Sequence, residues 1–495
     1  MNKLEVFHSI KDKAHQGGGT DKIQMQHNLN KMTARERIAT LVDEGTFIEL
    51  GALIAGNAAG VITGHGTIGG RLVYVYSFDY TVEGGAFNKA MAKKICNLLD
   101  NAGKMGAPVV QIVDSVGAKL SEGIELLSSY GMILRKIGKL SGVIPQISVI
   151  CGPCYGMAAM GATMADFTIA VNEIGELGIN SSEKISKVEE KYVDESMFSD
   201  GNYASKNGNA NFLAESEIHA FKLAKNIIKY LPANNLETPW TTEEDYNLNQ
   251  LREELESMVA DENYSMDSII ANIADNGSVL EVNREYVEGF KTGLIKINGL
   301  TVGAIWNSFV KSKITNEGIM KVSSFVRLCD SFNIPILSLV DTNGFAISLE
   351  EEKKGLGRNA GRLLYSLIDA TVPKVSLIIG EANGAGYVAL ASKEAAFDVT
   401  LAWPSARVSL TNPKELIKFM HRAEIMSSSD PKVKEKEVVE RYMEEMVSPY
   451  KAAELGLIDD IINPSETKQR IFAILDMLQS KRELSYPKKH GSTLV

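Results

Sequence analysis

The chain has 495 residues, of which 44% are hydrophobic and 23% charged, and its net charge is −10 at pH 7. This balance is typical of a globular protein with a large core, and it excludes the basic surface that a nucleic-acid-binding protein needs. The four cysteines are too few for a disulfide framework and favour a reducing compartment. No signal peptide, membrane span or metal-ligand spacing of histidines is visible, so we expect a soluble cytoplasmic protein without a metal site.

Segments of the first half of the chain return in the second half, in the same order. Repeated strand–turn patterns occur in any α/β protein, but here the distance between equivalent residues stays between 227 and 232 residues. This constancy favours two copies of one domain. The aligned pairs are Asp43 with Asp275, Thr63 with Thr292, Asp114 with Asp341 and Pro145 with Pro373.

The two copies cover about residues 25–235 and 265–465. A polar and acidic segment, residues 231–256, connects them and predicts a linker. We therefore predict an N-terminal domain over residues 1–240 and a C-terminal domain over residues 241–495.

Within each copy, short apolar β-branched runs alternate with a segment of helical periodicity. Such an alternation predicts an α/β fold with parallel strands and right-handed crossovers. The predicted strands and helices, in chain order, are strand 109–115, helix 121–140, strand 145–150, strand 336–341, helix 357–370 and strand 373–379.

Each copy also has two glycine-bearing turns directly after a strand. Backbone N–H groups at the start of a helix lack partners and carry partial positive charge, so two converging turns could stabilise an oxyanion or enolate. The alternative is that these glycines only permit tight turns or close packing. Four turns at equivalent places favour a functional role. They are residues 114–118 and 152–158 in the first copy and 341–345 and 380–386 in the second.

No conventional catalytic motif accompanies these turns. Asp114 and Asp341 end equivalent strands and could act as general bases, but we favour the interpretation that each caps the following turn. Cys151 and Cys154 have the spacing of a thiol–disulfide centre. The repeat argues against that role, because the neighbouring glycines recur in the second copy and the cysteines do not.

Longer segments carry a family resemblance, and TARERI and ATVPKV are its most specific parts. In these segments the chain resembles the carboxyltransferase subunits of biotin-dependent acyl-CoA carboxylases. This family includes the propionyl-CoA carboxylase β chain, transcarboxylase and the methylmalonyl-CoA decarboxylase α chain. The segments are GGGTDKIQMQHNLNKMTARERIATLVDEGTFIEL, GVIPQISVICGPCYGMAA, YLPANNLETP, FVRLCDSFNIPILSLVD, LLYSLIDATVPKV, LAWPSA and SPYKAAELGLIDDIINPSETKQRI.

The resemblance implies two tandem crotonase-like domains, with acyl-CoA on the first and biotin on the second. It implies an active site where the first domain of one subunit meets the second domain of another, in a homo-oligomer that is often a hexamer. The chain has no Met-Lys-Met attachment motif, so biotin must arrive on a separate carrier protein. A biotin carboxylase or a membrane sodium-pump subunit would be a further partner, depending on the direction of the reaction.

The resemblance also implies site residues. The amides of the thioester side would be those of Gly156 and Met157, with Gly117 and Ala118 in the adjacent turn. The amides of the biotin side would be those of Ala385 and Gly386 beside Gly384, with Gly344 and Phe345 nearby, and Val388 stands at a position that helps set acyl specificity.

Several of these positions depart from the usual family pattern. Met157 replaces a glycine, Asn343 replaces a proline, Val388 replaces an aspartate, and residues 411–416 lack the usual glycines.

The leading hypothesis is a carboxyltransferase between carrier-bound biotin and a short-chain acyl-CoA, with propionyl- or methylmalonyl-CoA favoured. The alternative is a catalytically altered paralogue that serves as a scaffold or binding subunit of such a complex.

Overall fold

The structure is a computed structural model, and it divides into two compact units. Unit 1 is Met1–Thr238 with Asn283–Tyr286, and unit 2 is Pro239–Val282 with Val287–Val495. No helix of the described part of the chain is both long and apolar enough to cross a membrane. The structure describes residues 2–54, 60–241, 250–259, 263–483 and 486–492, so residues 242–249 of the predicted linker at 231–256 lie outside the described residues.

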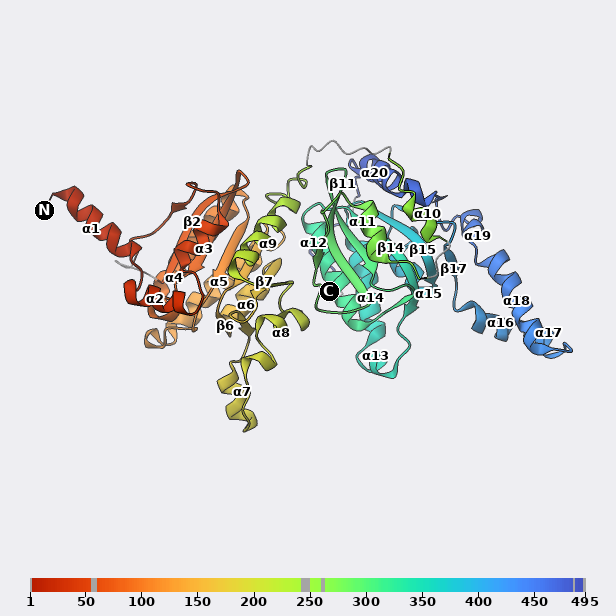
Figure 1. Cartoon of the computed structure of the whole chain (residues 1–495), viewed down its shortest axis with the longest axis horizontal. Helices are drawn as coiled ribbons and strands as arrows, with labels where there is room; N and C mark the ends of the chain where they lie inside the picture. Colours follow the sequence, from red (N-terminus) through yellow and green to blue (C-terminus); the bar gives the residue numbers. More distant parts are fainter. Residues whose placement is uncertain (1, 55–59, 242–249, 260–262, 484–485, 493–495) are drawn as a thin grey trace. The chain divides into compact units, whose positions relative to one another are not determined.

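Unit 1 is built on a seven-stranded sheet in the order β1-β2-β3-β4-β5-β7-β9 (Figure 1). The first three strands are antiparallel, and from β3 onwards neighbouring strands are parallel. Its elements are α1 (Lys3–His15), α2 (Thr20–Asn28), α3 (Ala34–Leu41), β1 (Ile48–Glu49), β2 (Val61–Ile68), β3 (Arg71–Phe78), η1 (Glu83–Gly85), α4 (Lys89–Met105), β4 (Val109–Val113), η2 (Leu120–Glu122), α5 (Glu125–Leu140), β5 (Gln146–Ile150), β6 (Pro153–Tyr155), α6 (Met157–Thr163), β7 (Phe167–Val171), β8 (Glu176–Gly178), α7 (Ser182–Glu189), η3 (Glu195–Met197), α8 (Gly201–Lys206), β9 (Phe212–Ala214) and α9 (Glu217–Tyr230).

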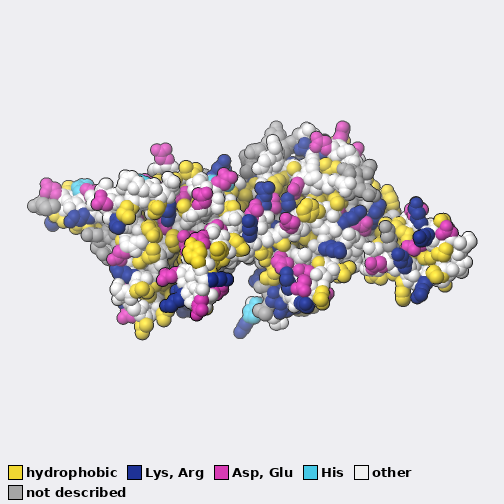
Figure 2. All heavy atoms as spheres, turned by 60° about the horizontal axis from the view of Figure 1, so that its bottom comes forward, with side chains coloured by type: hydrophobic (Ala, Val, Ile, Leu, Met, Phe, Trp, Pro, Cys, Tyr) yellow, Lys and Arg dark blue, Asp and Glu magenta, His cyan; other side chains and the backbone are white. Residues whose placement is uncertain are grey.

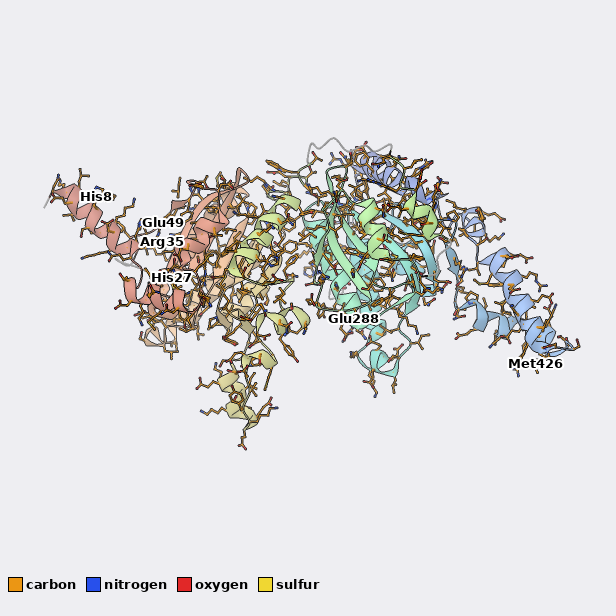
Figure 3. All side chains as sticks on the ribbon, in the orientation of Figure 1. His8, His27, Arg35, Glu49, Glu288 and Met426 are labelled. Carbon is orange, nitrogen blue, oxygen red and sulfur yellow. The ribbon has the colours of Figure 1, made fainter. Side chains whose placement is uncertain are left out.

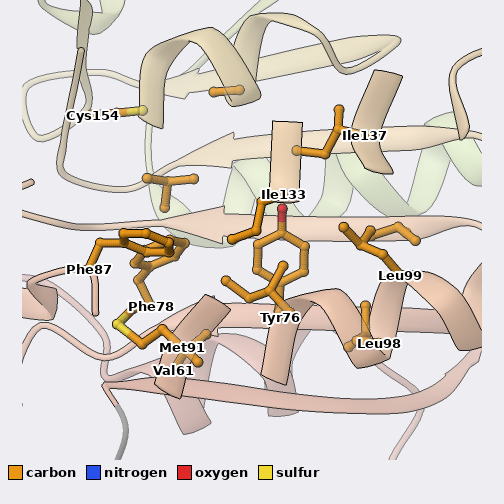
Figure 4. Packing of buried hydrophobic residues seen from close by; sticks show 14 of the residues in the cluster. Val61, Tyr76, Phe78, Phe87, Met91, Leu98, Leu99, Ile133, Ile137 and Cys154 are labelled. Carbon is orange, nitrogen blue, oxygen red and sulfur yellow. The ribbon is translucent and has the colours of Figure 1, made fainter. Parts of the chain in front are cut away.

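The core of unit 1 lies between this sheet and the helices α4 and α5. Helix α5 buries Leu126, Tyr130, Ile133 and Ile137, whose spacing of three or four residues places them on one face. Every residue of β4, β5 and β7 is buried, as in parallel strands that are covered on both faces. Figure 4 shows the resulting apolar packing, in which Cys154 is one of the core residues.

Unit 2 repeats this architecture on a second sheet, whose main path is β10-β11-β12-β14-β15-β16-β18. Its elements are α10 (Glu254–Met258), α11 (Met266–Ile273), β10 (Leu280–Val282), β11 (Phe290–Ile297), β12 (Leu300–Asn307), β13 (Ser312–Ile314), α12 (Asn316–Ser331), β14 (Ile336–Phe345), α13 (Leu349–Lys353), α14 (Leu356–Asp369), β15 (Lys374–Asn383), α15 (Gly384–Leu390), β16 (Val399–Ala402), β17 (Arg407–Ser409), α16 (Pro413–Met420), α17 (Arg422–Met426), α18 (Pro431–Met446), α19 (Pro449–Glu454), β18 (Asp460–Ile461), η4 (Pro464–Glu466) and α20 (Thr467–Leu478).

The predicted internal repeat is confirmed by the two sheets, which share the pattern of an antiparallel hairpin followed by parallel strands. One side-chain detail recurs as well. The Asp43 carboxylate accepts hydrogen bonds from the N–H groups of Gly69 and Gly70 in the β2–β3 turn. Asp275 does the same for Asn298 and Gly299 in the β11–β12 turn.

The prediction that the glycine motifs are turns outside the strands is wrong for the second copy. Residues 341–345 belong to β14, and residues 380–383 belong to β15. Both strands continue past the main sheet because β13 and β17 pair with their ends and satisfy their backbone groups. In the first copy, residues 153–155 likewise form β6, which pairs with β8.

Charged side chains of both signs are interspersed over the face drawn in Figure 2. Apolar side chains lie singly or in small groups between them on that face. That pattern agrees with the acidic net charge and with the absence of a basic surface in the composition.

Candidate active site

In unit 2, the ends of β14 and β15 bring two glycine-bearing segments into contact. Gly344 has a φ of +85° and lies against Gly386, where an added Cβ would be 2.8 Å from the Gly344 Cα. Gly384, with a φ of +53°, turns the chain from β15 into α15. The N–H groups of Ala385 and Gly386 lie in the first helical turn, where no intrahelical acceptor exists.

The N–H groups at the end of β14 have different environments. That of Gly344 donates to Thr342 Oγ1 at 3.1 Å and is therefore occupied. That of Ala346 donates to the carbonyl oxygen of Ile314 at 2.9 Å. Successive N–H groups of a strand point to opposite sides, so the N–H of Phe345 faces away from β13. The N–H groups of Phe345, Ala385 and Gly386 are therefore the candidates for contact with a ligand.

Unit 1 has the same arrangement around Gly117, whose φ is +107°. The Gly117 N–H donates to Ser115 Oγ at 3.1 Å. The N–H of Lys119 donates to the Phe87 carbonyl oxygen at 2.9 Å, so the intervening N–H of Ala118 faces away from Phe87. Each of these contacts has its counterpart 227 residues later in unit 2.

The second segment of unit 1 begins at Gly156, which has a φ of +63°. Its N–H donates to the Gly178 carbonyl oxygen at 3.1 Å. Met157 starts α6, so its N–H lacks an intrahelical acceptor. Ala118, Met157 and Ala158 pack against the same apolar core, which brings the two segments together.

The side chain of Met157 lines a small apolar cavity in the core of unit 1. The cavity has a volume of about 30 Å³, which is space for one or two groups of the size of water. In unit 2, Val388 lies on α15 with 41% of its surface exposed. The cavity is lined by Tyr76, Phe78, Phe87, Ile95, Gln111, Val113, Tyr130, Ile133, Leu134, Ile137, Met157, Ala158 and Gly161.

Asp114, the first residue of the first glycine segment of unit 1, is completely buried by side chains that come from residues before the sheet. Its carboxylate lies 2.8 Å from Lys31 Nζ and 2.9 Å from Arg37 Nη1, and it accepts a hydrogen bond from Gln26. The interpretation as a turn cap is therefore wrong, because these ion pairs use the carboxylate. A Cβ at Gly152 would lie only 1.9 Å from Asp114 Oδ1, which explains the glycine there.

The TARERI segment thereby acquires a structural role that its spacing did not reveal. Thr33 and Glu36 form a capping box that starts α3, and Arg37 on that helix also contacts Glu217 at 2.6 Å. Arg35 pairs with Glu49 at 2.7 Å, and both are labelled in Figure 3. The segment therefore anchors the strand end at which the first glycine segment begins.

Asp341 is equally buried in unit 2, but its partners are of another kind. It accepts hydrogen bonds from the N–H groups of Glu381 and Lys311 and from the Tyr264 hydroxyl. A Cβ at Gly380 would lie 2.5 Å from Asp341 Oδ1. The turn-cap interpretation is wrong here too, because the carboxylate connects three segments instead of capping its own turn.

The two cysteines of the Cys-x-x-Cys segment are both fully buried free thiols. Burial raises the pKa of Cys154 to about 12, and burial likewise raises the pKa of Cys151. A thiol–disulfide enzyme needs an accessible thiolate of lowered pKa. The structure therefore contradicts the thiol–disulfide hypothesis.

Comparison with known proteins places this geometry in a family. The model of the "Carboxyl transferase domain" family matches residues 25–493. A propionyl-CoA carboxylase carboxyltransferase subunit of Haloferax mediterranei is 36% identical, over 99% of each chain. The methylmalonyl-CoA decarboxylase subunit alpha of Propionigenium modestum is 37% identical, over 99% of this chain and 98% of the relative.

The architecture agrees with a solved structure as well. The crystal structure of the transcarboxylase 12S hexamer, with methylmalonyl-coenzyme A and methylmalonic acid bound, superimposes with a TM-score of 0.94. It is 32% identical in sequence and covers 99% of this chain and 98% of its own. The prediction of two tandem crotonase-like domains is thereby confirmed. The chain belongs to the carboxyl transferase domain family, whose characterised relatives are carboxyltransferase and decarboxylase subunits.

Proposed function

We propose that this chain moves a carboxyl group between carrier-bound biotin and the α-carbon of propionyl- or methylmalonyl-CoA. The observation that carries this proposal is the whole-length similarity to relatives named for these two substrates. The methylmalonyl-coenzyme A bound to the 12S relative supports the same substrate class.

On the acyl-CoA side, backbone amides would stabilise the negative charge that develops on the thioester oxygen. The amides of Gly117 and Gly156 already donate within the protein, so those of Ala118 and Met157 are the ones we assign to the oxyanion. The small size of the cavity beside Met157, about 30 Å³, fits a short acyl group better than a long one.

On the biotin side, the backbone N–H groups of Phe345, Ala385 and Gly386 would donate hydrogen bonds to the ureido oxygen. The close approach of Gly344 to Gly386 fits this role, because a Cβ at Gly386 would lie 2.8 Å from the Gly344 Cα and push the two segments apart. Biotin, when bound, supplies the transferable carboxyl group and the base for the substrate α-proton. The protein then only has to position the acyl-CoA and biotin, and no protein carboxylate is required at the reacting carbon.

Both glycine sites are bordered by exposed apolar side chains at equivalent positions, which supports a homo-oligomer, with a hexamer favoured. The pairs are Leu120 and Ile347, exposed by 89% and 85%, Met160 and Val388, exposed by 47% and 41%, and Ile179 and Leu410, exposed by 58% and 81%. Exposed apolar side chains around a site are typical of a surface that a partner covers. We propose that copies of this chain, a biotin carrier protein, and a biotin carboxylase or a membrane sodium-pump subunit form the working assembly, in the cytoplasm.

The comparisons do not favour the non-catalytic alternative. Relatives that match nearly the whole chain are subunits of enzymes, and none of the departures removes a backbone amide from the sites described above.

An assay with free biotin and methylmalonyl-, malonyl- or glutaconyl-CoA tests the proposal. We expect biotin-dependent loss of the carboxyl group from methylmalonyl-CoA, followed by release of CO2. Folded oligomeric protein that turns over none of the three substrates would contradict it. Binding of these thioesters in a calorimeter without turnover would support the scaffold alternative.

A further inference from the structure

A buried asparagine connects the two strand ends of the glycine site in unit 2. Asn383, the last residue of β15, is 7% exposed. Its Nδ2 donates to Asn343 Oδ1 at 3.1 Å, and its Oδ1 accepts a hydrogen bond from Ser409 Oγ. One side chain thus links β14, β15 and β17.

This link lies at the ends of the two strands, directly before the site glycines. Backbone pairing of β14 with β15 runs as far as Thr342 and Ala382. Asn343 and Asn383 are the next residues, and each directly precedes a site glycine, Gly344 or Gly384. The Asn343–Asn383 bridge therefore extends the connection beyond the end of the backbone ladder.

Unit 1 lacks the bridge at the equivalent positions, which are Val116 and Tyr155. Val116 is 59% exposed and has no polar side-chain atom. The Tyr155 hydroxyl donates to Glu176 Oε2 at 2.8 Å and lies 3.0 Å from Ser199 Oγ, so it points to a different segment. The two sites share a backbone arrangement, but the hydrogen bond between Asn343 and Asn383 has no counterpart at the equivalent positions of unit 1.

We propose that Asn383 is a positioning residue, which acts through Asn343 to hold the Phe345 and Ala385 amides at the spacing that receives the ureido oxygen of biotin. This inference rests on the proposed function, because it assigns biotin to unit 2. A fully bonded buried polar group fixes local geometry, and fixed donors contribute most to recognition of a single oxygen atom.

The test measures biotin and acyl-CoA separately on the full-length oligomer. Asn383→Ala, Asn343→Ala and the double variant are compared for the affinity of free biotin by calorimetry and for the KM of each substrate. We expect each single variant to weaken biotin about tenfold and the double variant to be no weaker than either, as for two partners in one interaction. The KM for acyl-CoA stays unchanged. Tyr155→Phe, at the equivalent position in unit 1, is the control and leaves biotin affinity unchanged.

Hydrogen exchange gives a readout that does not depend on activity. We expect faster exchange of the backbone amides of residues 343–345 and 383–386 in both single variants. Asn343 is exposed, so its replacement keeps the test valid even if Asn383→Ala misfolds.

Additive losses of biotin affinity, an altered KM for acyl-CoA, or wild-type affinity in both single variants would overturn the inference. Wild-type protein that binds biotin but turns over no acyl-CoA would contradict the proposed function alone, since the binding comparison still holds. Wild-type protein that does not bind biotin at any concentration would overturn both.

Discussion

The two units use one backbone design and hold it in two different ways. Unit 1 anchors the buried Asp114 with the cations of Lys31, in the segment between α2 and α3, and of Arg37 on α3. Unit 2 anchors the equivalent Asp341 with two backbone N–H groups and the Tyr264 hydroxyl. Both units thus repeat the aspartate and the glycine that leaves room for it, whereas the groups that bind the carboxylate differ.

The glycine beside the aspartate offers the strongest test of this comparison. Gly152→Ala would place a Cβ 1.9 Å from Asp114 Oδ1 and 2.7 Å from Lys31 Nζ. Breaking a buried ion pair costs ~3–5 kcal/mol, and we expect a loss of that size in the free energy of unfolding, measured with urea. Gly380→Ala costs less, because its nearest contacts, Asp341 Oδ1 and the Tyr264 hydroxyl, are both 2.5 Å away and no buried ion pair is broken.

Gly131→Ala is the matched control for Gly152→Ala, because its Cβ meets nothing within 4 Å. The exposed helical position predicts unchanged or slightly raised stability, by up to ~1 kcal/mol. Equal unfolding midpoints for Gly152→Ala and Gly131→Ala would contradict the role assigned to Asp114.

Gly386→Ala tests the close approach that is particular to unit 2, since unit 1 already has Ala158 at this place. The added Cβ would lie 2.8 Å from the Gly344 Cα and force the two segments apart. We expect kcat/KM for biotin to fall about a hundredfold, as when an oxyanion donor is displaced, while acyl-CoA still binds. Gly361→Ala on α14, where a Cβ meets nothing within 4 Å, is the control. Loss of acyl-CoA affinity in Gly386→Ala would contradict the division of roles between the units.

Lys94 on α4 gives a pH-dependent test within unit 1. Burial lowers the pKa of Lys94 from 10.5 to about 8. Between these two values the unfolded chain binds more protons than the folded one. The destabilising contribution of the buried Lys94 therefore decreases, and the free energy of unfolding rises, as the pH increases from 8 to 10.5. Lys94→Met removes this pH-dependent contribution, which is at most ~3.4 kcal/mol for a pKa lowered from 10.5 to about 8.

The measurement is the difference in unfolding free energy between the wild type and Lys94→Met at several pH values. Lys93→Met, at an exposed position on the same helix, is the control. A difference that is constant from pH 8 to 10.5 would show that the buried lysine does not titrate in this window.

Met157 provides the smallest expected effect. Met157→Ala enlarges the cavity of about 30 Å³ in unit 1, where the first methylenes of a longer acyl group would lie. One added methylene contributes about 0.8 kcal/mol, so we expect the preference for ethylmalonyl- over methylmalonyl-CoA to rise about fourfold. Val388→Ala, in the same assay, reports whether unit 2 also sets acyl size. An unchanged preference in both variants would place the acyl group elsewhere.

Local sequence patterns predicted much of this structure. The helical spacing at 121–140 and the apolar run at 145–150 correspond to α5 and β5. The strand extensions at 341–345 and 380–383 escaped prediction, because β13 and β17, which pair with them, are only three residues long. Glycine in these segments indicated turns, whereas here it keeps space for a neighbouring backbone or carboxylate.

The candidate site shows the same division. Repetition of Gly117, Gly156, Gly344 and Gly384 identified where the backbone bends, and their roles in binding stay predictions. Which N–H groups are occupied depended on contacts such as Gly156 with Gly178, which the sequence pattern does not encode. The contribution of TARERI was visible as a family motif only, because Arg37 meets Asp114 from 77 residues away.

The sequence by itself determined the two-copy α/β organisation, the family and the places of the glycine segments, because periodicity, repetition and motif are local properties. Tertiary structure decided how those segments are held, since burial and distance depend on residues far apart in the chain. It buried the Cys151–Cys154 pair, turned two expected turn caps into anchors, and joined Asn343 to Asn383 in one copy only.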